Sequence, residues 1–193
     1  MQGRNEGSMN DDYKEIFLNT RTLHTRRLLL REFTLQDEEQ VLEYGSDEMT
    51  LKYLIWEGIA DISGARLAIT NYYSKPGVFA LALEETNLCI GCIDLRLEPQ
   101  NEKGSFGYIL NRKYWNQGYM SEALLRILKF SFEELELNRV EATYYEGNEG
   151  SGRVMEKCGM IQEGIGIQEV KVKGIYHNVV HLGMIRAQWL LHH

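Results

Sequence analysis

The stretch Tyr108-Ile-Leu-Asn-Arg-Lys-Tyr-Trp-Asn-Gln-Gly-Tyr-Met-Ser-Glu-Ala123 is the part of this chain that decides its fold. It predicts the end of a strand, a polar loop around Gly118 and the start of a long amphipathic helix. Unpaired N–H groups and the positive end of the helix dipole make such a helix start attractive to an anion. Gly118 permits close approach of the backbone, Ser121 adds a hydroxyl, and Arg112 and Lys113 add positive charge. The residues alone leave two interpretations open, a diphosphate-binding loop and an ordinary connection.

Strands and helices alternate on both sides of this stretch. Apolar or alternating runs predict strands at 26–33, 78–83, 88–97, 105–110, 139–145, 164–172 and 175–185. Capping residues and apolar periodicity predict helices at about 34–44, 61–73, 120–135 and 151–157. Short turns join the strands from 78 to 110, which indicates an antiparallel meander. We therefore predict one mixed α/β domain over 9–193, with residues 1–8 the remnant of an expression tag.

Composition and charge narrow the class of protein. The chain has 193 residues, enough for one domain, with 44% hydrophobic and 25% charged residues, as in ordinary globular proteins. The 28 acidic against 21 basic residues give a net charge of −7, which argues against a nucleic-acid partner. Neither a bilayer-length apolar run nor a secretory leader is present, so we expect a cytoplasmic protein without a membrane partner.

Cys89, Cys92 and Cys158 do not form a metal-binding or disulfide pattern. Cys89 and Cys92 have C-x-x-C spacing, but no second pair completes a set of four thiolates. Both fall in the predicted strand 88–97, where residues three apart point to opposite faces. We therefore interpret them as apolar strand residues in a reducing compartment and predict no metal.

Three segments carry a family resemblance. Trp115-Asn-Gln-Gly-Tyr-Met-Ser-Glu-Ala123 resembles the acetyl-CoA pyrophosphate loop of the GNAT N-acetyltransferase superfamily. Asn148-Glu-Gly-Ser151, continuing to Lys157-Cys-Gly159-Met160, is similar to a segment of its branch that acetylates ribosomal-protein N-termini (RimJ/RimL-like), and Gly174-Ile-Tyr-His-Asn178 through Trp189 is similar to that branch's tail. The resemblance implies the GNAT fold: a mostly antiparallel sheet of about seven strands, with splayed parallel middle strands at 105–110 and 139–145, flanked by about four helices.

The same resemblance implies the roles of individual residues. Acetyl-CoA would be bound by Ile109, Leu110, Arg112, Gln117, Gly118, Tyr119, Met120, Ser121, Asn148 and Arg153. Met120 stands where the family has a small residue and is expected to add bulk against the cofactor. Of the residues assigned to catalysis on this side, Ser151 would protonate the departing thiolate, with Tyr145 as an alternative, and Asn148 would bind the pantetheine or hold a water; Ser151 is equally a candidate helix N-cap.

The acceptor side is less sharply defined. The base would be Glu169, with Glu57, Asp94, His177 and His181 as alternatives, and the acceptor pocket would include Tyr53, Trp56 and Asp94. The implied reaction is direct transfer of the acetyl group, through a tetrahedral intermediate, to a primary amine such as a ribosomal-protein N-terminus. A small amine (polyamine, aminoglycoside or amino acid) is the alternative acceptor. A non-catalytic acyl-CoA sensor and a nucleotide-binding module remain as other classes, and the apolar terminal hairpin permits a homodimer.

Overall fold

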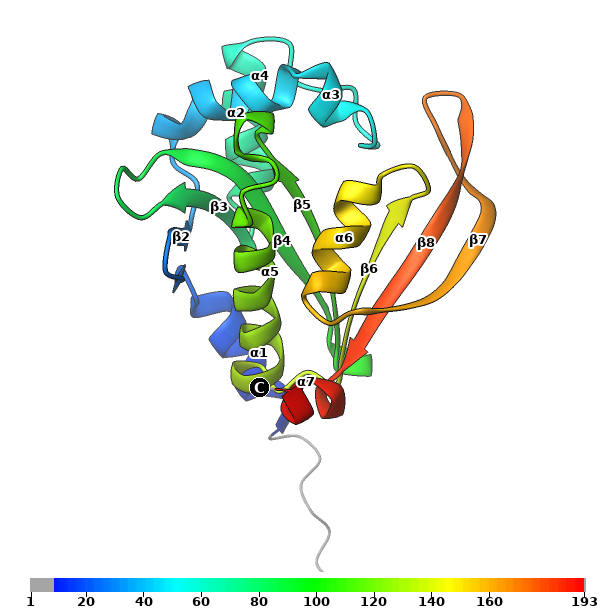
Figure 1. Cartoon of the computed structure of the whole chain (residues 1–193). Coiled ribbons are helices and arrows are strands. Elements are labelled where there is room, and N and C mark those ends of the chain that lie inside the picture. Colours follow the sequence, from blue (N-terminus) through cyan, green and yellow to red (C-terminus); the bar gives the residue numbers. More distant parts are fainter. Residues whose placement is uncertain (1–8, 193) are drawn as a thin grey trace, which may run out of the picture.

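A central mixed sheet organises the chain. The computed structural model describes residues 9–192, so the predicted tag remnant at 1–8 lies outside the described residues. The sheet has eight strands in the order β1-β2-β3-β4-β5-β6-β8-β7 (Figure 1). Their bounds are β1 Thr22–His24, β2 Leu28–Arg31, β3 Val78–Leu83, β4 Cys89–Glu98, β5 Lys103–Leu110, β6 Arg139–Tyr145, β7 Ile161–Val172 and β8 Ile175–Ile185. Neighbouring strands are antiparallel except β5 and β6, which confirms the predicted meander and the parallel middle pair.

The described residues form seven α-helices. These are α1 Met9–Asn19, α2 Glu38–Ser46, α3 Glu48–Leu51, α4 Ile62–Ala68, α5 Tyr119–Lys129, α6 Glu149–Lys157 and α7 Arg186–His192. The four predicted helices correspond to α2, α4, α5 and α6, while α1, α3, α7 and strand β1 were not predicted. Three of the four missed elements are seven residues or shorter, and such short segments depend on tertiary packing more than on local pattern. Trp189 of α7, for example, is buried.

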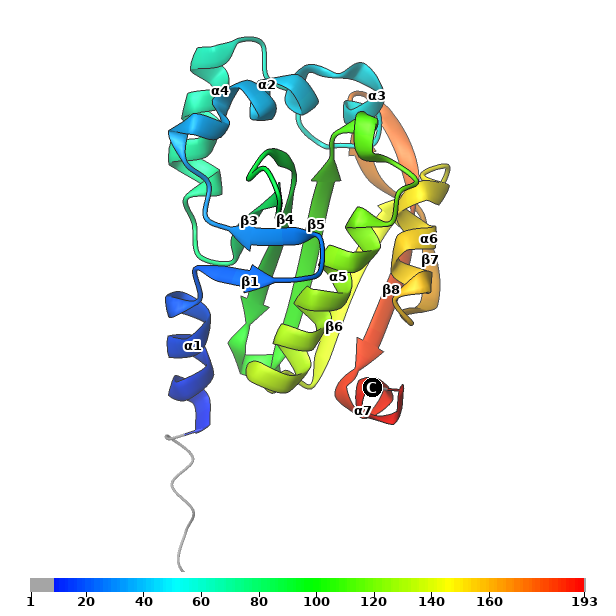
Figure 2. The ribbon, with the colours of Figure 1, turned by 60° about the vertical axis from the view of Figure 1, so that its left-hand side comes forward.

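Helices pack on both faces of the sheet and form two apolar cores. Helices α5 and α6 lie over one face, while α2, α3 and α4 gather toward one end of the sheet (Figures 1 and 2). The larger core, between the sheet and the α5–α6 layer, includes Leu124, Ile127 and Met155. The smaller core, under α2 and α4, includes Val41 and Ala65. No helix within residues 9–192 is both long enough and apolar enough to cross a membrane.

The parallel strands β5 and β6 pair only at their beginnings. The register runs from Lys103 opposite Arg139 to Ser105 opposite Glu141, and the pairing ends there. On its other side β5 stays paired with β4 along its whole length, from Lys103 to Leu110. The two parallel strands therefore splay apart as the resemblance implied, and the edge of β5 beyond Ser105 is open toward β6.

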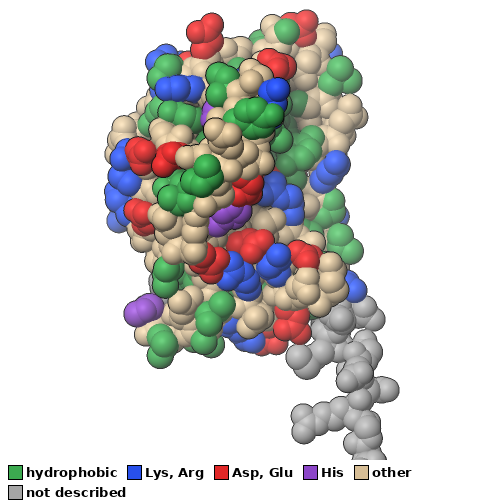
Figure 3. All heavy atoms as spheres, turned by 90° about the vertical axis from the view of Figure 1, so that its right-hand side faces the viewer, with side chains coloured by type: hydrophobic (Ala, Val, Ile, Leu, Met, Phe, Trp, Pro, Cys, Tyr) green, Lys and Arg blue, Asp and Glu red, His purple; other side chains and the backbone are tan. Residues whose placement is uncertain are grey.

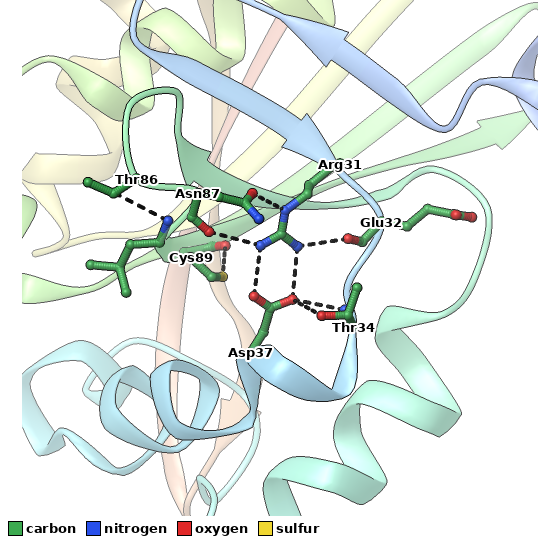
Figure 4. A network of polar contacts seen from close by, with 9 residues as sticks. Arg31, Glu32, Thr34, Asp37, Thr86, Asn87 and Cys89 are labelled. Carbon is green, nitrogen blue, oxygen red and sulfur yellow. Dashed lines mark hydrogen bonds and ion pairs between the residues drawn. The ribbon is translucent and has the colours of Figure 1, made fainter.

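An ion-pair network fixes the meander to α2 (Figure 4). The Arg31 guanidinium donates to both carboxylate oxygens of Asp37, at 2.9 and 2.8 Å, and to the side chain and carbonyl of Asn87 in the β3–β4 turn. Asp37 also accepts from the Thr34 backbone N–H, which completes the predicted capping box ahead of α2. Because Arg31 and Asp37 are largely buried, this network holds β2, the hairpin and α2 in one arrangement.

The expectation that Cys89 and Cys92 point to opposite faces was wrong. The register between β3 and β4 shifts: Leu81 lies opposite Gly91 and Ala82 opposite Cys89, so Ile90 is the extra residue of a β-bulge. Because the bulge adds one residue between them, Cys89 and Cys92 point to the same face of the sheet, and both lie buried in the smaller core. They are free thiols, as expected of apolar strand residues.

Candidate active site

A cavity of about 690 Å³ opens where β5 and β6 splay apart. Strands β4, β5 and β6, the start of α6, the end of α4 and the loop after α3 all contribute to its walls. Of the predicted site residues, those that line it are Tyr53, Trp56, Asp94, Ile109, Tyr145, Asn148 and Ser151. The cavity reaches both faces of the sheet, since Met155 of the α5–α6 layer and Tyr73 of the opposite layer both line it.

A tyrosine and a serine meet at the end of the cavity near α6. The Tyr108 hydroxyl lies 2.9 Å from the Ser151 Oγ and 3.0 Å from the Ser151 carbonyl oxygen, to which it donates. Burial raises the pKa of the Tyr108 phenol far above its usual range, so the hydroxyl keeps its proton at neutral pH. The pair thus offers a protonated donor beside a second hydroxyl.

Asn148, and not Ser151, is the N-cap of α6. The Asn148 side chain accepts from the Ser151 backbone N–H, so Ser151 stands inside the first turn and its alternative role as N-cap is wrong. This leaves the Ser151 hydroxyl to Tyr108. Tyr145 also lines the cavity, with its ring stacked on His177 at 5.0 Å, which sets His177 behind the tyrosine.

A buried carboxylate lies on the opposite face of the sheet. Asp94 Oδ2 accepts from the Tyr72 hydroxyl at 2.5 Å and from Arg96 Nη1 at 3.0 Å, and Oδ1 accepts from the Gly107 backbone N–H at 2.7 Å. Tyr72 belongs to the π-helical turn Ile69–Tyr73 that ends α4, and such turns are frequent at functional sites. Burial, and then the bond to Asp94, raise the pKa of Tyr72 well above its usual range, so it remains a hydrogen-bond donor.

Consecutive residues of β5 serve the two ends of the cavity. Gly107 holds Asp94 on one face of the sheet, and the Tyr108 side chain reaches Ser151 on the other. Asn111 donates its backbone N–H to Ile90 of β4, so alternation turns the backbone groups of Leu110 and Tyr108 toward the opening. The carbonyl of Ile109 faces Gly91 of β4 instead, and the Leu110 carbonyl already accepts from the Trp115 indole N–H at 2.8 Å. The predicted strand-like pairing with pantetheine is therefore available at Tyr108 and at the Leu110 N–H but not at Ile109.

The helix start at Gly118 has the geometry of an anion site. Gly118 is the N-cap of α5 with φ 82°, a left-handed conformation that favours glycine. Arg27, which the sequence analysis did not single out, lies beside it. The Arg27 guanidinium donates to the Gln117 carbonyl at 3.0 Å and to Glu122 at 2.7 Å, and it covers the Tyr119 ring. The Arg27 guanidinium, fixed by its ion pair with Glu122, thus lies beside the N–H groups of the first turn as a further donor.

Several predicted cofactor residues have other surroundings. Arg112 pairs with Asp47 at 3.2 Å and Lys113 pairs with Glu43, so acidic side chains of the α2–α3 segment partly neutralise both cations. The Met120 side chain is buried in the larger core, so the expectation that it adds bulk against the cofactor was wrong; only its backbone is at the helix start. Ser121 is half-buried and Arg153 is exposed on α6.

The proposed base Glu169 does not reach the cavity. Its carboxylate lies 2.7 Å from His181 Nε2 across the β7–β8 hairpin, where both side chains are substantially exposed. Figure 3 shows this side of the molecule, on which charged side chains of both signs gather around histidine. Glu57 is exposed and is also not among the lining residues. Of the carboxylates considered as bases, Asp94 is the one that lines the cavity.

Some of the missed residues left a signal in the sequence. Tyr108 is the first residue of the stretch 108–123, and Arg27 belongs to the predicted strand 26–33. Their partners, Ser151 and Glu122, are far away in the chain. Tyr72 was inside the predicted helix 61–73, and only the π-helical turn directs it toward Asp94. Over residues 9–192 there is no cluster of three or more His, Cys, Asp or Glu side chains suited to a metal ion.

Comparisons with known proteins agree with this architecture. The sequence model of a family described as an acetyltransferase (GNAT) domain matches residues 27–161. The uncharacterized N-acetyltransferase p20 of Bacillus licheniformis is 30% identical over 174 residues, which cover 87% of this chain and 98% of that protein. A Bacillus subtilis protein provisionally named ribosomal N-acetyltransferase YdaF is 33% identical over 119 residues, 61% of this chain and 64% of the relative. The crystal structure of an acetyltransferase (GNAT family) from Bacillus anthracis has a TM-score of 0.80 and 31% identity, covering 86% of this chain and 99% of that chain.

Proposed function

This chain belongs to the GNAT acetyltransferase family, and from that premise we propose that it transfers the acetyl group of acetyl-CoA directly to a primary amine. The observation that carries the proposal is the cavity between the splayed strands, with Tyr108 and Ser151 at one end and Asp94 at the other. The hydroxyls that would protonate the leaving thiolate and the carboxylate that would bind the amine lie on opposite faces of one sheet. This arrangement suits acetyl-CoA and an amine that meet in the gap between β5 and β6.

The cofactor side is supported by the donors present. The first turn of α5, with Gly118 and Arg27, would hold the diphosphate of acetyl-CoA through N–H groups and one guanidinium. The open edge of β5, at Tyr108 and at the Leu110 N–H, would pair with the amide-bearing pantetheine as an added strand. A backbone N–H of this edge would also stabilise the oxyanion of the tetrahedral intermediate, which is typically worth about 10²–10³ in rate.

The proton transfers follow from the same geometry. Ser151 and Tyr108 would return a proton to the departing thiolate, either hydroxyl donating while the other relays. On the acceptor side, Asp94 would hold the incoming ammonium and receive its proton through water, the role first given to Glu169. Tyr72, Arg96 and Gly107 keep the Asp94 carboxylate oriented toward the cavity.

Two kinds of acceptor amine follow from the sequence analysis. The provisional name of the Bacillus subtilis relative favours a ribosomal-protein N-terminus. A small amine is favoured by the Tyr53 hydroxyl, which donates to the Gly147 carbonyl at 2.7 Å and so joins the loop after α3 to the β6–α6 turn beside the cavity. A bridge of this kind restricts the room for a polypeptide.

Titration calorimetry with acetyl-CoA tests the proposal, with ATP and NAD as controls, followed by release of free CoA thiol in the presence of primary amines. We expect saturable acetyl-CoA binding and amine-dependent thiol release. Binding without thiol release for any amine would indicate an acyl-CoA sensor. Binding of ATP or NAD in competition with acetyl-CoA would indicate a nucleotide-binding module and would reject the transferase.

A further inference from the structure

The charges inside the cavity bear on the identity of the acceptor. Of all the residues that line it, Asp94 and Arg96 are the pair with full charges, and the remainder are apolar, aromatic, glycine or neutral polar residues. The two charges are opposite and 3.0 Å apart. A polyamine would bring several positive charges to a pocket whose single carboxylate already has a cationic partner, so this pocket is poorly matched to a polycation.

Each of the two charged groups keeps a side available for a ligand. Arg96 uses Nη1 for Asp94 and contacts the Ser105 hydroxyl through Nε, so Nη2 is left to face an incoming anion. Its side chain is 55% exposed, whereas that of Asp94 is 8% exposed. Asp94 is held from three directions by Tyr72, Arg96 and Gly107, and a carboxylate oxygen accepts more than one hydrogen bond.

We propose that the acceptor is a free α-amino acid with an apolar or aromatic side chain, whose ammonium pairs with Asp94 and whose carboxylate pairs with Arg96. The inference rests on the proposed acetyl transfer. In an α-amino acid one carbon atom separates the amine from the carboxylate, so covalent geometry holds the two charges about as close together as those of the Asp94–Arg96 pair. Placed head to tail, the ligand satisfies both protein groups at once.

The rest of the pocket fits the side chain of such an acceptor. Tyr53, Trp56, Tyr72 and Tyr145 contribute aromatic surface to the walls, with Ile55 and Ile59 beside them. Aromatic walls around a few convergent polar groups are typical of small-molecule sites. An ammonium held by Asp94 would lie beside Gly107 on the β4–β5 wall of the cavity, which also opens onto the gap in which the thioester would lie.

The experiment compares matched acceptors with acetyl-CoA at saturation, by CoA thiol release. The set contains leucine and phenylalanine, their carboxamides, a β-amino acid, spermidine and a tripeptide with a free N-terminus. The carboxamides keep the side chain and the amine but lose the carboxylate, and their amine is less basic and so more often deprotonated. A preference for the free acids must therefore come from recognition. We expect kcat/KM for the free α-amino acids to exceed that for the carboxamides by about 10–100-fold.

Variants assign that preference to the charged pair. Arg96→Gln should bring the acid-to-amide ratio close to one; the ratio is the readout because loss of the Arg96 contact to Asp94 lowers the rates with acid and amide alike. Arg96→Lys should retain part of the ratio because it keeps the charge without the planar fork. Arg66→Gln is the matched control, because Arg66 pairs with Glu38 outside the cavity. Thermal unfolding of each variant verifies that it folds. If Arg96→Gln does not fold, the acid-to-amide ratio of Arg96→Lys still decides the test.

The outcomes separate the two proposals. Equal or faster reaction of the carboxamides, spermidine, the tripeptide or the β-amino acid in the wild type would overturn the α-amino acid assignment and leave the acetyltransferase standing. An acid-to-amide ratio that survives in Arg96→Gln would overturn the role of Arg96. Failure to bind acetyl-CoA, or to release thiol with every amine, would instead reject the proposed function and this inference with it.

Discussion

Replacing Gly118 by aspartate tests the position of the diphosphate. Gly118 has φ 82°, and a residue with a Cβ pays about 1–2 kcal/mol to adopt the left-handed conformation. A Cβ at this position would lie 3.4 Å from Arg27 Nη2, in ordinary contact, so steric overlap adds little. Gly118→Ala therefore isolates the backbone strain, and Gly118→Asp adds a negative charge to the same strain.

The charge dominates the effect on acetyl-CoA. A carboxylate about 5 Å from one diphosphate charge, at an effective dielectric constant of about 20, is repelled by about 3 kcal/mol. The dissociation constant of acetyl-CoA should therefore be about 100-fold larger for Gly118→Asp than for Gly118→Ala. The aspartate would also lie within reach of Arg27 and compete with the diphosphate for its guanidinium.

Calorimetric titration at two salt concentrations measures this difference. Both variants should lose about 1–2 kcal/mol of unfolding free energy in urea, and only the aspartate variant should lose most of its acetyl-CoA affinity. The gap between the two should narrow as salt rises from 50 to 300 mM, since screening weakens the repulsion. Equal affinities of the aspartate and alanine variants would refute the reasoning, because the diphosphate would then lie elsewhere.

Three further predictions concern Tyr108 as the proton donor to the thiolate, the Glu122 carboxylate that binds Thr25 and Arg27, and the buried thiol of Cys89. Tyr108→Phe should lower kcat by about 10²-fold or more with little change in the KM for acetyl-CoA; an unaltered kcat in the thiol-release assay would reject the donor role. Burial raises the pKa of Glu122, but hydrogen bonds from Thr25 and Arg27 outweigh it and hold that pKa below its usual 4.5. This stabilisation is complete above pH 4.5 and is lost as pH falls through the folded pKa. Glu122→Gln should thus lower the free energy of unfolding by about 1–2 kcal/mol at pH 7 and by less at pH 3. Equal losses in urea unfolding at the two pH values would contradict the stabilising role of the Glu122 carboxylate. Burial raises the pKa of Cys89 to about 12, so iodoacetamide at pH 8 should label it only after unfolding, and rapid labelling of the native protein, seen by mass spectrometry, would contradict its burial.

Local pattern determined the framework of this protein. Three predicted strands have the same bounds in the structure: β3 at 78–83, β6 at 139–145 and β8 at 175–185. A continuous apolar run or an alternation of apolar and polar residues is a property of neighbouring residues, so the sequence alone shows where such a strand begins and ends. Asp61 caps α4 as its side chain indicated, and Gly118 begins α5. The family was predicted from the resemblance of three segments in the right order, Trp115–Ala123, Asn148–Met160 and Gly174–Trp189, because the turn chemistry at Gly118 alone fitted an ordinary connection equally well.

Only the tertiary structure decided which side chains meet in the cavity. Tyr108 and Ser151 are 43 residues apart in the chain, Tyr72 and Asp94 are 22 apart, and Arg27 and Glu122 are 95 apart. Local pattern carries no signal for such pairs, because strand order, the splay of β5 from β6 and the π-helical turn after α4 bring them together. Glu169 failed as a base for the same reason: a carboxylate becomes part of a site through the surface it faces, and that surface is set by packing between elements distant in the sequence.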